Sequence, residues 1–152
     1  MEKEKALDRM MASCSRREYC RRDIMDKLSR LDVQKNEAEW VVEKLCKDEF
    51  IDEARYAAAF ARDKSSLQGW GPVKIRAALT AKGIDAATVA AALGEIDSPA
   101  AESKLRALLQ GKMRQLKDEQ EQIRRAKLLR FALGRGYEYA QILKEYDNIR
   151  TT

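Results

Sequence analysis

The chain has 152 residues, the size of one ordinary domain or of a few small repeats, and a net charge of +5. Leu, Ile, Val and Phe supply 31 of the 152 residues, and helix-favouring residue types far outnumber β-branched ones, so the composition predicts an all-α protein. The absence of histidine excludes Ser-His-Asp triads, histidine-based acid–base catalysis and every metal site that needs histidine.

Cysteine usage and hydropathy indicate an intracellular protein without a cofactor. Cys14, Cys20 and Cys46 are odd in number and form no Cys-x-x-Cys pair, so we expect free thiols in a reducing compartment and no bound metal. No apolar run is long enough to span a bilayer and no signal peptide opens the chain. These features predict a cytoplasmic protein that does not associate with membranes.

Three helices are expected in the first fifty residues. The first covers about residues 3 to 13, and Ser15 with Glu18 has the spacing of a capping box that would start the second. The second helix would carry Tyr19 and several aliphatic residues, and the third would cover about residues 36 to 48. On the third helix we expect Trp40 to be buried in the core.

The middle of the chain contains clear signals for helix ends. Asp52 and Asp85 are suitable N-caps, and Pro72 fits the first position of a helix, where its missing N–H is no loss. Gly83 follows the helix that starts at Pro72 and can adopt the left-handed conformation that ends it. A further helix is expected to open at Ser98-Pro99.

The apolar positions repeat along the chain. The spacing of Ile75, Leu79, Ile84, Val89 and Leu93 recurs from Leu128 to Tyr146, and it recurs from Ile24 to Leu45 with a three-residue insertion. We therefore expect an elongated array of three tandem three-helix repeats, at residues 1–51, 52–97 and 98–152. The expected core consists of Ile24, Leu28, Val41, Leu45, Ile75, Leu79, Ile84, Val89, Leu93, Leu128, Tyr137 and Ile142.

Glycine ends two of the three repeated helices. Gly83 and Gly136 stand at matching positions and are each expected at positive φ, so a β-branched residue there should cost on the order of 1 kcal/mol or more. The first repeat has Leu31-Asp32-Val33 instead, and its helix is expected to end differently.

The entire net positive charge lies in the last third of the chain. Residues 101–152 carry 12 basic and 7 acidic side chains, whereas the two earlier thirds are neutral. No acidic residue stands between Gln122 and Tyr137, so the like charges there lack sequence neighbours to pair with. This predicts a surface for an anionic partner. The basic residues of the stretch are Arg124, Arg125, Lys127, Arg130 and Arg135.

Three motifs are spread along the chain. The central motif joins Gly69-Trp70-Gly71-Pro72 to Lys82-Gly83-Ile84 at a fixed distance, and it follows a helix that begins with Asp52-Glu53-Ala54-Arg55-Tyr56. Ser15-Arg16-Arg17-Glu18-Tyr19 lies in the first repeat, and Lys127-Leu128-Leu129-Arg130-Phe131 with Arg135-Gly136-Tyr137 lies in the third. These motifs resemble the central, opening and closing motifs of the RecX family, bacterial regulators of the recombinase RecA. The resemblance covers residues 5 to 146, except that the connection from Gln110 to Gln122 has no alignable pattern.

The resemblance implies a non-enzymatic regulator that lies in the groove of the RecA–DNA filament and modulates its recombinase and coprotease activities. Its structural motif residues would be Gly69, Trp70, Gly71, Pro72, Gly83 and Gly136. For Trp70 we favour a role in locking its loop onto the core, with stacking on a base or a partner as the alternative. Besides the basic stretch, candidate contacts to the filament or DNA are Lys74, Arg76, Lys82, Arg16 and Arg17.

Two further classes of function are weaker. A direct DNA-binding protein made of stacked helices would explain the basic stretch, but the first hundred residues are neutral, so DNA binding should be weak, non-specific and salt-dependent. An enzyme would have to use paired carboxylates or a lysine, or a metal held by the acidic residues from Asp48 to Glu53, which are better explained as helix caps. We expect a monomer that contains neither metal nor cofactor.

The charge distribution generates a functional prediction. Reversing Arg124 and Lys127 to glutamate should weaken inhibition of the filament and flatten its salt dependence, with the helical content unchanged. Reversing Arg21 and Arg22, which have acidic neighbours, should do less. Titration of each variant into a RecA ATP-hydrolysis assay measures the difference, and equal loss from both pairs would contradict a basic anchor in the last third.

Overall fold

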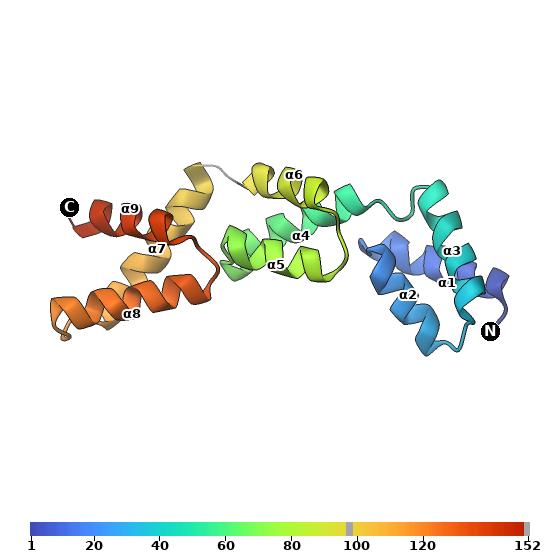
Figure 1. Cartoon of the computed structure of the whole chain (residues 1–152), viewed down its shortest axis with the longest axis horizontal. Coiled ribbons are helices and arrows are strands. Elements are labelled where there is room, and N and C mark those ends of the chain that lie inside the picture. Colours follow the sequence, from blue (N-terminus) through green and yellow to red (C-terminus); the bar gives the residue numbers. More distant parts are fainter. Residues whose placement is uncertain (97–98, 151–152) are drawn as a thin grey trace. The chain divides into compact units, whose positions relative to one another are not determined.

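The computed structural model describes residues 1–96 and 99–150 and confirms the predicted all-α class. Across these ranges the structure contains nine helices and no strand (Figure 1). They are α1 (Lys3–Arg16), α2 (Arg21–Arg30), α3 (Lys35–Lys47), α4 (Glu53–Gln68), α5 (Pro72–Ala81), α6 (Ala86–Ile96), α7 (Pro99–Gln115), α8 (Glu121–Gly134) and α9 (Tyr139–Arg150).

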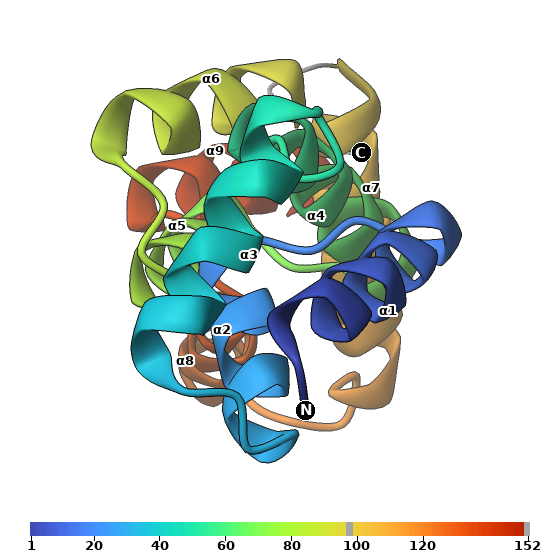
Figure 2. The same ribbon diagram turned by 90° about the vertical axis from the view of Figure 1, so that its right-hand side faces the viewer.

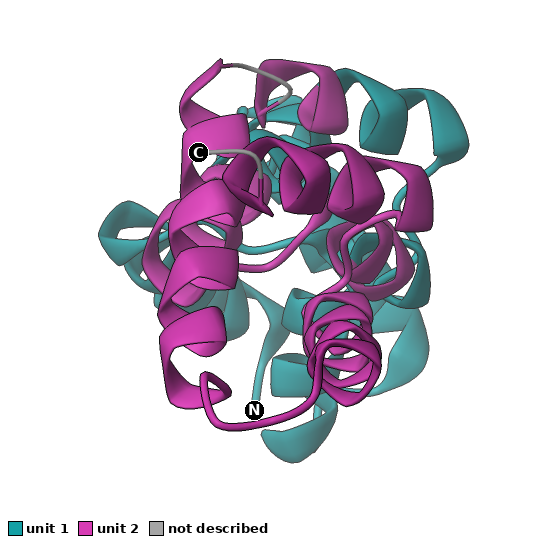
Figure 3. Cartoon of the chain, turned by 90° about the vertical axis from the view of Figure 1, so that its left-hand side faces the viewer, with its two compact units in different colours: residues 1–59, 79–91 teal, residues 60–78, 92–152 magenta. Residues whose placement is uncertain are grey.

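The chain forms two compact units (Figure 3). Unit 1 comprises residues 1–59 and 79–91, and unit 2 comprises residues 60–78 and 92–152. The helix count fits three repeats of three helices, but the boundaries 1–51, 52–97 and 98–152 stay a prediction. The second of them, at Asp97 and Ser98, lies outside the described residues.

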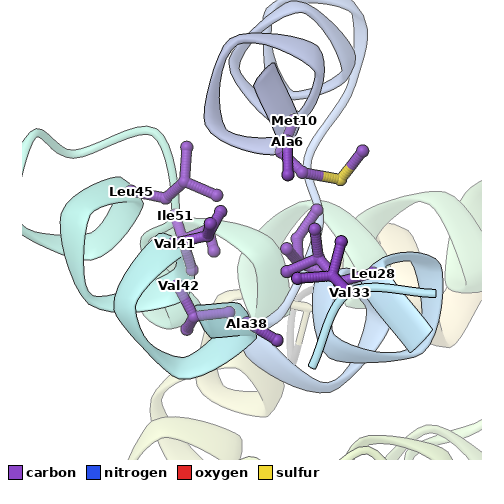
Figure 4. Packing of buried hydrophobic residues seen from close by; sticks show 10 residues of the cluster. Ala6, Met10, Leu28, Val33, Ala38, Val41, Val42, Leu45 and Ile51 are labelled. Atoms are coloured by element: carbon purple, nitrogen blue, oxygen red, sulfur yellow. The ribbon is translucent and has the colours of Figure 1, made fainter. Parts of the chain in front are cut away.

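The core of unit 1 lies among its first three helices. Helix α3 packs against both α1 and α2. Figure 4 shows Ala6 and Met10 of α1 opposite Val41 and Leu45 of α3, with Leu28 of α2 beside them. The same cluster includes Val33, Ala38, Val42, Ile51 and Ile24. Burial of this apolar surface is the main force that holds α1, α2 and α3 together.

A second apolar cluster forms where α7, α8 and α9 pack on one another in unit 2; Figure 2 gives another view of these helices. Each helix supplies one face at helical spacing. The buried members are Leu105 and Leu109 from α7, Leu128 and Ala132 from α8, Tyr137 from the turn that follows, and Ile142 and Tyr146 from α9.

The predicted core is confirmed at every position except Leu93, which is only partly buried. Its neighbour Ala92 is buried instead. Trp40 is also partly exposed rather than buried: its ring packs on the edge of the unit 1 core, and the ammonium groups of Lys3 and Lys44 lie 4.6 and 5.8 Å from its centroid. An indole at the core margin can be covered by the aliphatic stems of lysines.

The three repeated helices end in the same way. Gly83 and Gly136 have φ values of 81° and 94°, as predicted. Asp32 has a φ of 58°, so the expectation that the first of these helices ends differently was wrong. In each case the next residue donates its N–H to a carbonyl five residues back, at 3.0 to 3.2 Å. Aspartate tolerates the left-handed conformation better than most non-glycine residues.

The capping box predicted at Ser15 and Glu18 was wrong. Ser15 lies inside the last turn of α1, where its hydroxyl donates to the Met11 carbonyl at 2.9 Å. Helix α2 starts at Arg21, and the N-cap is Cys20, whose N–H donates to the Asp23 carboxylate at 3.4 Å. Tyr19 therefore precedes α2. Serine in a final helical turn readily bonds the carbonyl four residues back, which removes it from the capping role.

The other predicted helix starts agree with the structure. The carboxylates of Asp52 and Asp85 accept the N–H groups of Arg55 and Thr88 at 3.1 and 2.8 Å. Pro72 and Pro99 are the first residues of α5 and α7. Ser98, expected to open α7 together with Pro99, lies outside the described residues. The sequence was sufficient to predict these helix starts, because each start depends only on residues next to it in the chain.

Unit 2 contains a joint between the α4–α5 turn and the α8–α9 turn. The N–H of Gly71 donates to the Arg135 carbonyl at 2.7 Å, and the N–H of Val73 donates to the Gly136 carbonyl at 2.8 Å. A Cβ on Gly71 would lie 2.5 Å from the Tyr137 nitrogen, and one on Gly136 would lie 2.7 Å from the Lys74 nitrogen. Glycine is required at both positions because the two backbones touch.

A polar joint connects α2 to the end of α5 inside unit 1. The Lys82 ammonium donates to the Asp23 carboxylate at 2.6 Å, and the Arg22 guanidinium donates to the Ala81 carbonyl. Burial raises the pKa of Asp23, but hydrogen bonds from Lys82 and Cys20 outweigh it, so that the pKa lies below its ordinary value. The charged carboxylate thus stabilises the folded unit.

Cys14, Cys20 and Cys46 are free, and burial raises the pKa of each thiol, which keeps it protonated and a poor nucleophile near neutral pH. None of the helices in the described ranges is both long and apolar enough to cross a membrane.

The glycine joint can be tested by adding a single methyl group. Gly136→Ala and Gly83→Ala impose similar strain at positive φ, about 1 kcal/mol each. At Gly83 the new Cβ meets only the Arg22 guanidinium at 3.0 Å, the end of a side chain that can shift by weakening its bond to the Ala81 carbonyl, whereas at Gly136 it meets the Lys74 backbone. Gly136→Ala should therefore cost about 1–3 kcal/mol more in urea unfolding followed by circular dichroism. An equal loss of unfolding free energy in the two variants would show that the backbone contact at Gly136 does not require glycine.

The polar joint predicts a pH dependence. Because the folded pKa of Asp23 is lowered, its contribution to stability is complete above its ordinary pKa of about 4 and is lost as the pH falls through the folded value. Asp23→Asn should lower the free energy of unfolding by roughly 1–3 kcal/mol at neutral pH and by little in acid. Asp26→Asn on the same helix, an exposed position, is the control. A loss from Asp23→Asn that stays constant with pH would contradict the assignment.

Candidate partner-binding surface

The basic stretch lies on α8 and at its C-terminal end. Arg124, Arg125, Lys127 and Arg130 are on the helix, and Arg135 is its C-cap. Leu128 and Ala132 face the core of unit 2, so the basic side chains occupy the remaining circumference of α8. Arg125, Lys127 and Arg130 are exposed, whereas Arg124 and Arg135 are partly buried.

Two of these five cations are engaged within the protein. Lys127 donates to the Glu119 carboxylate at 2.6 Å, so the prediction that its charge is unpaired was wrong. Arg135 donates to the Gln68 carbonyl at 3.1 Å, and its guanidinium lies 5.2 Å from the centre of the Phe131 ring. The acid that pairs with Lys127 comes from the loop before α8, eight residues earlier, beyond the window of sequence that had no acid.

Arg125 and Arg130 remain free to contact a partner. Their side chains form no hydrogen bond, ion pair or ring contact with any other residue that the structure describes. Exposed cations of this kind are the ones whose charge an anionic surface can neutralise at little desolvation cost.

Trp70 sits in the glycine-rich turn with its ring between two lysines. The ammonium groups of Lys64 and Lys74 lie 4.7 and 4.5 Å from its centroid, and Phe60 meets it edge-on at 6.2 Å. These contacts hold the turn to its own unit, in line with the favoured interpretation of Trp70. The ring is nonetheless partly exposed and lines an open cavity with Pro72, Arg76, Tyr137 and Lys144, among others.

The remaining candidates differ in their availability. Lys74 covers Trp70, while Arg76 is exposed at the cavity. Lys82 is bound to Asp23 in the polar joint. Arg16 is exposed at the end of α1, and the guanidinium of Arg17 lies 4.5 Å from the centre of the Tyr19 ring. The structure does not bring the unit 1 candidates Arg16, Arg17 and Lys82 into one cluster with a shared contact.

The structure shows a basic cluster that the sequence analysis missed. Arg114, in the last turn of α7, and Lys117, in the following loop, line an open cavity together with Arg124. Both lie in the connection between Gln110 and Gln122, which had no alignable pattern. The available signal was the run of three cations at Lys112, Arg114 and Lys117, interrupted by no acidic residue.

Comparison with known proteins decides the family. The model of the second three-helix domain of RecX matches residues 52–93, which include the joint turn at Gly69–Pro72 and Gly83. A regulatory protein RecX from Prosthecochloris aestuarii is 33% identical over 147 residues, covering 97% of this chain and 95% of the relative. The chain belongs to the RecX family. The members of this family are non-enzymatic regulatory proteins, in agreement with the expectation from the sequence.

Matches to other RecX proteins support the same family assignment. A regulatory protein RecX from Xanthomonas campestris is 30% identical over 99 residues, spanning 65% of this chain and 60% of that protein. A crystal structure of regulatory protein RecX matches with a TM-score of 0.86 at 25% identity, covering 95% of this chain and 71% of the other. RecX from Lactobacillus salivarius matches in fold with a TM-score of 0.88 at 21% identity, covering 99% and 97%.

Proposed function

We propose that this protein regulates a RecA recombinase by binding the RecA–DNA filament and limiting its recombinase and coprotease activities. The observation that carries the proposal is the match to regulatory proteins RecX over 97% of the chain. The protein would act in the cytoplasm as a monomer built of the three repeats, and it would bind without chemistry of its own.

The charge distribution supports a filament as the partner. A filament of protein on DNA presents phosphates along its length, and a protein lying against it must place cations without local counter-charges at the contact. Arg125 and Arg130 on α8 meet this requirement, and Arg76 and Arg16 are further exposed candidates. Lys82, Lys127 and Arg135 already have partners inside the protein and would contribute less.

A second candidate function is direct, non-specific DNA binding through the same exposed arginines. The two functions are separated by titrating the protein into single-stranded DNA with and without RecA and ATP, and following both DNA binding and ATP hydrolysis. Inhibition of hydrolysis at concentrations far below those that bind bare DNA supports filament targeting. Inhibition that follows the occupancy of bare DNA supports the second candidate.

The residue-level test uses Arg125→Glu with Arg130→Glu. This double variant is a better test than reversal of Arg124 with Lys127, because Lys127 is paired with Glu119 inside the protein. The control pair Arg21 with Arg22 is also unsuitable, since Arg22 bonds the end of α5. Reversing two exposed charges should reduce inhibitory potency by roughly tenfold and flatten its salt dependence. The reason is that each lost attraction at the contact becomes a repulsion.

The matched control is Lys5→Glu with Arg9→Glu on α1. Both positions are exposed, and neither side chain is bonded to another residue in the described ranges. The control should inhibit nearly as well as the wild-type protein, and both double variants should keep their circular dichroism. Equal loss from the two pairs would refute the role of α8 in the contact.

A further inference from the structure

The cavity at the α7–α8 connection has an unusual lining. It is formed by Gln110, Met113, Arg114, Lys117, Arg124 and Ile149, all in unit 2. Three of these residues are cations, one is a neutral amide, two are apolar, and no carboxylate is among them. A cavity whose charged lining residues are all cations is chemically suited to an anion.

Two acidic residues of the α7–α8 connection and the start of α8 interact with cations outside the cavity lining. Glu119 accepts a hydrogen bond from Lys127, and Glu121 lies 3.9 Å from the Arg150 guanidinium. The side chains of Arg114, Lys117 and Arg124 make no ion pair with any residue that the structure describes. Arg114 and Lys117 are exposed and Arg124 is partly buried, so three cations without an ion-pair partner in the described ranges line this cavity.

Arg124 provides an independent indication of a ligand. Its Nε atom is buried and has no hydrogen-bond partner in the described part of the chain. A buried N–H donor without a partner costs about 1–3 kcal/mol, more when the group is charged. Such an atom in a native protein calls for an explanation. A rotation of the Arg124 side chain toward the adjoining cavity would expose this N–H and let an anion there accept its hydrogen bond.

The position of Arg124 on its helix strengthens this argument. It lies in the first turns of α8, whose N-cap Gln120 forms no side-chain capping bond. A cation is unfavourable at the positive end of a helix dipole, whereas an anion is favoured there. Arg114, in the last turn of α7, is in contrast well placed for the dipole of its own helix, so the unfavourable charge is specifically Arg124.

We propose that Arg114, Lys117 and Arg124 form a binding site for a phosphate group. Two arginines offer planar forks of donors and the lysine adds a mobile point charge, a combination that matches the several acceptor oxygens of a phosphate. The phosphate can belong to a free ion or to the backbone of a nucleic acid. The site does not depend on the proposed filament function, since it is defined by this chain alone.

The test follows the arginine side-chain signals by nuclear magnetic resonance in the full-length protein without RecA. Titration with inorganic phosphate at constant ionic strength should shift the Nε–H signal of Arg124 in a saturable manner at millimolar concentrations. Arg124→Gln should weaken binding by about tenfold or more, because it removes a charge-assisted hydrogen bond. Backbone signals of Arg114 and Lys117 should shift with the same midpoint.

Arg62→Gln is the matched control, because Arg62 is an exposed cation of unit 2 outside the cavity lining. It should bind phosphate like the wild-type protein. Equal weakening by Arg124→Gln and Arg62→Gln, or an Arg124 signal that does not respond to phosphate, would overturn the proposal. The backbone signals also show whether Arg124→Gln remains folded.

A second titration identifies the source of the phosphate. A short single-stranded oligonucleotide that shifts the same signals and displaces inorganic phosphate would assign the site to a nucleic-acid backbone. Saturation by inorganic phosphate with no response of these signals to the oligonucleotide would assign it to a free phosphate. Either result supports the site, whereas shifts spread over all exposed basic residues would show only non-specific charge attraction and refute it.

Discussion

The contact between two backbones in unit 2 is the constraint on which much of the family motif depends. The turn before α5 and the turn after α8 meet through two N–H to carbonyl bonds, with no side chain between them. This approach requires glycine at positions 71 and 136. It also places Trp70 beside two lysines and directs Arg135 to a carbonyl of α4. Several motif residues that suggest binding therefore serve first to hold helices together.

The two ends of α5 are each held to another helix or turn, but by different kinds of bond. In unit 2 the contact is made by main-chain atoms, which hold their geometry independently of pH and salt. In unit 1 the end of α5 is held by Arg22 and by the Asp23–Lys82 pair, whose strength depends on charge. Residues with formal charge thus have structural roles in unit 1 and remain more available on α8 of unit 2.

Local sequence signals predicted most of the fold because each depended on neighbouring residues. Asp52, Pro72 and Gly83 each control a helix end directly. The failures came from choices between competing local bonds, as at Ser15, or from tolerance of an uncommon conformation, as at Asp32. The candidate surface was harder to predict: Glu119, Gln68 and Arg114 meet α8 only through the tertiary fold, so which cations are paired could not be read from their spacing.

The chain's two tryptophans fall one in each compact unit. Trp40 lies at the margin of the unit 1 core, and Trp70 lies in the turn of unit 2. Each indole is partly exposed and has ammonium groups within 6 Å of its ring, so its emission depends on the local fold. Replacing one tryptophan with phenylalanine leaves a single indole, which can be excited selectively over the five tyrosines. The melting of each unit can then be followed separately without an attached label.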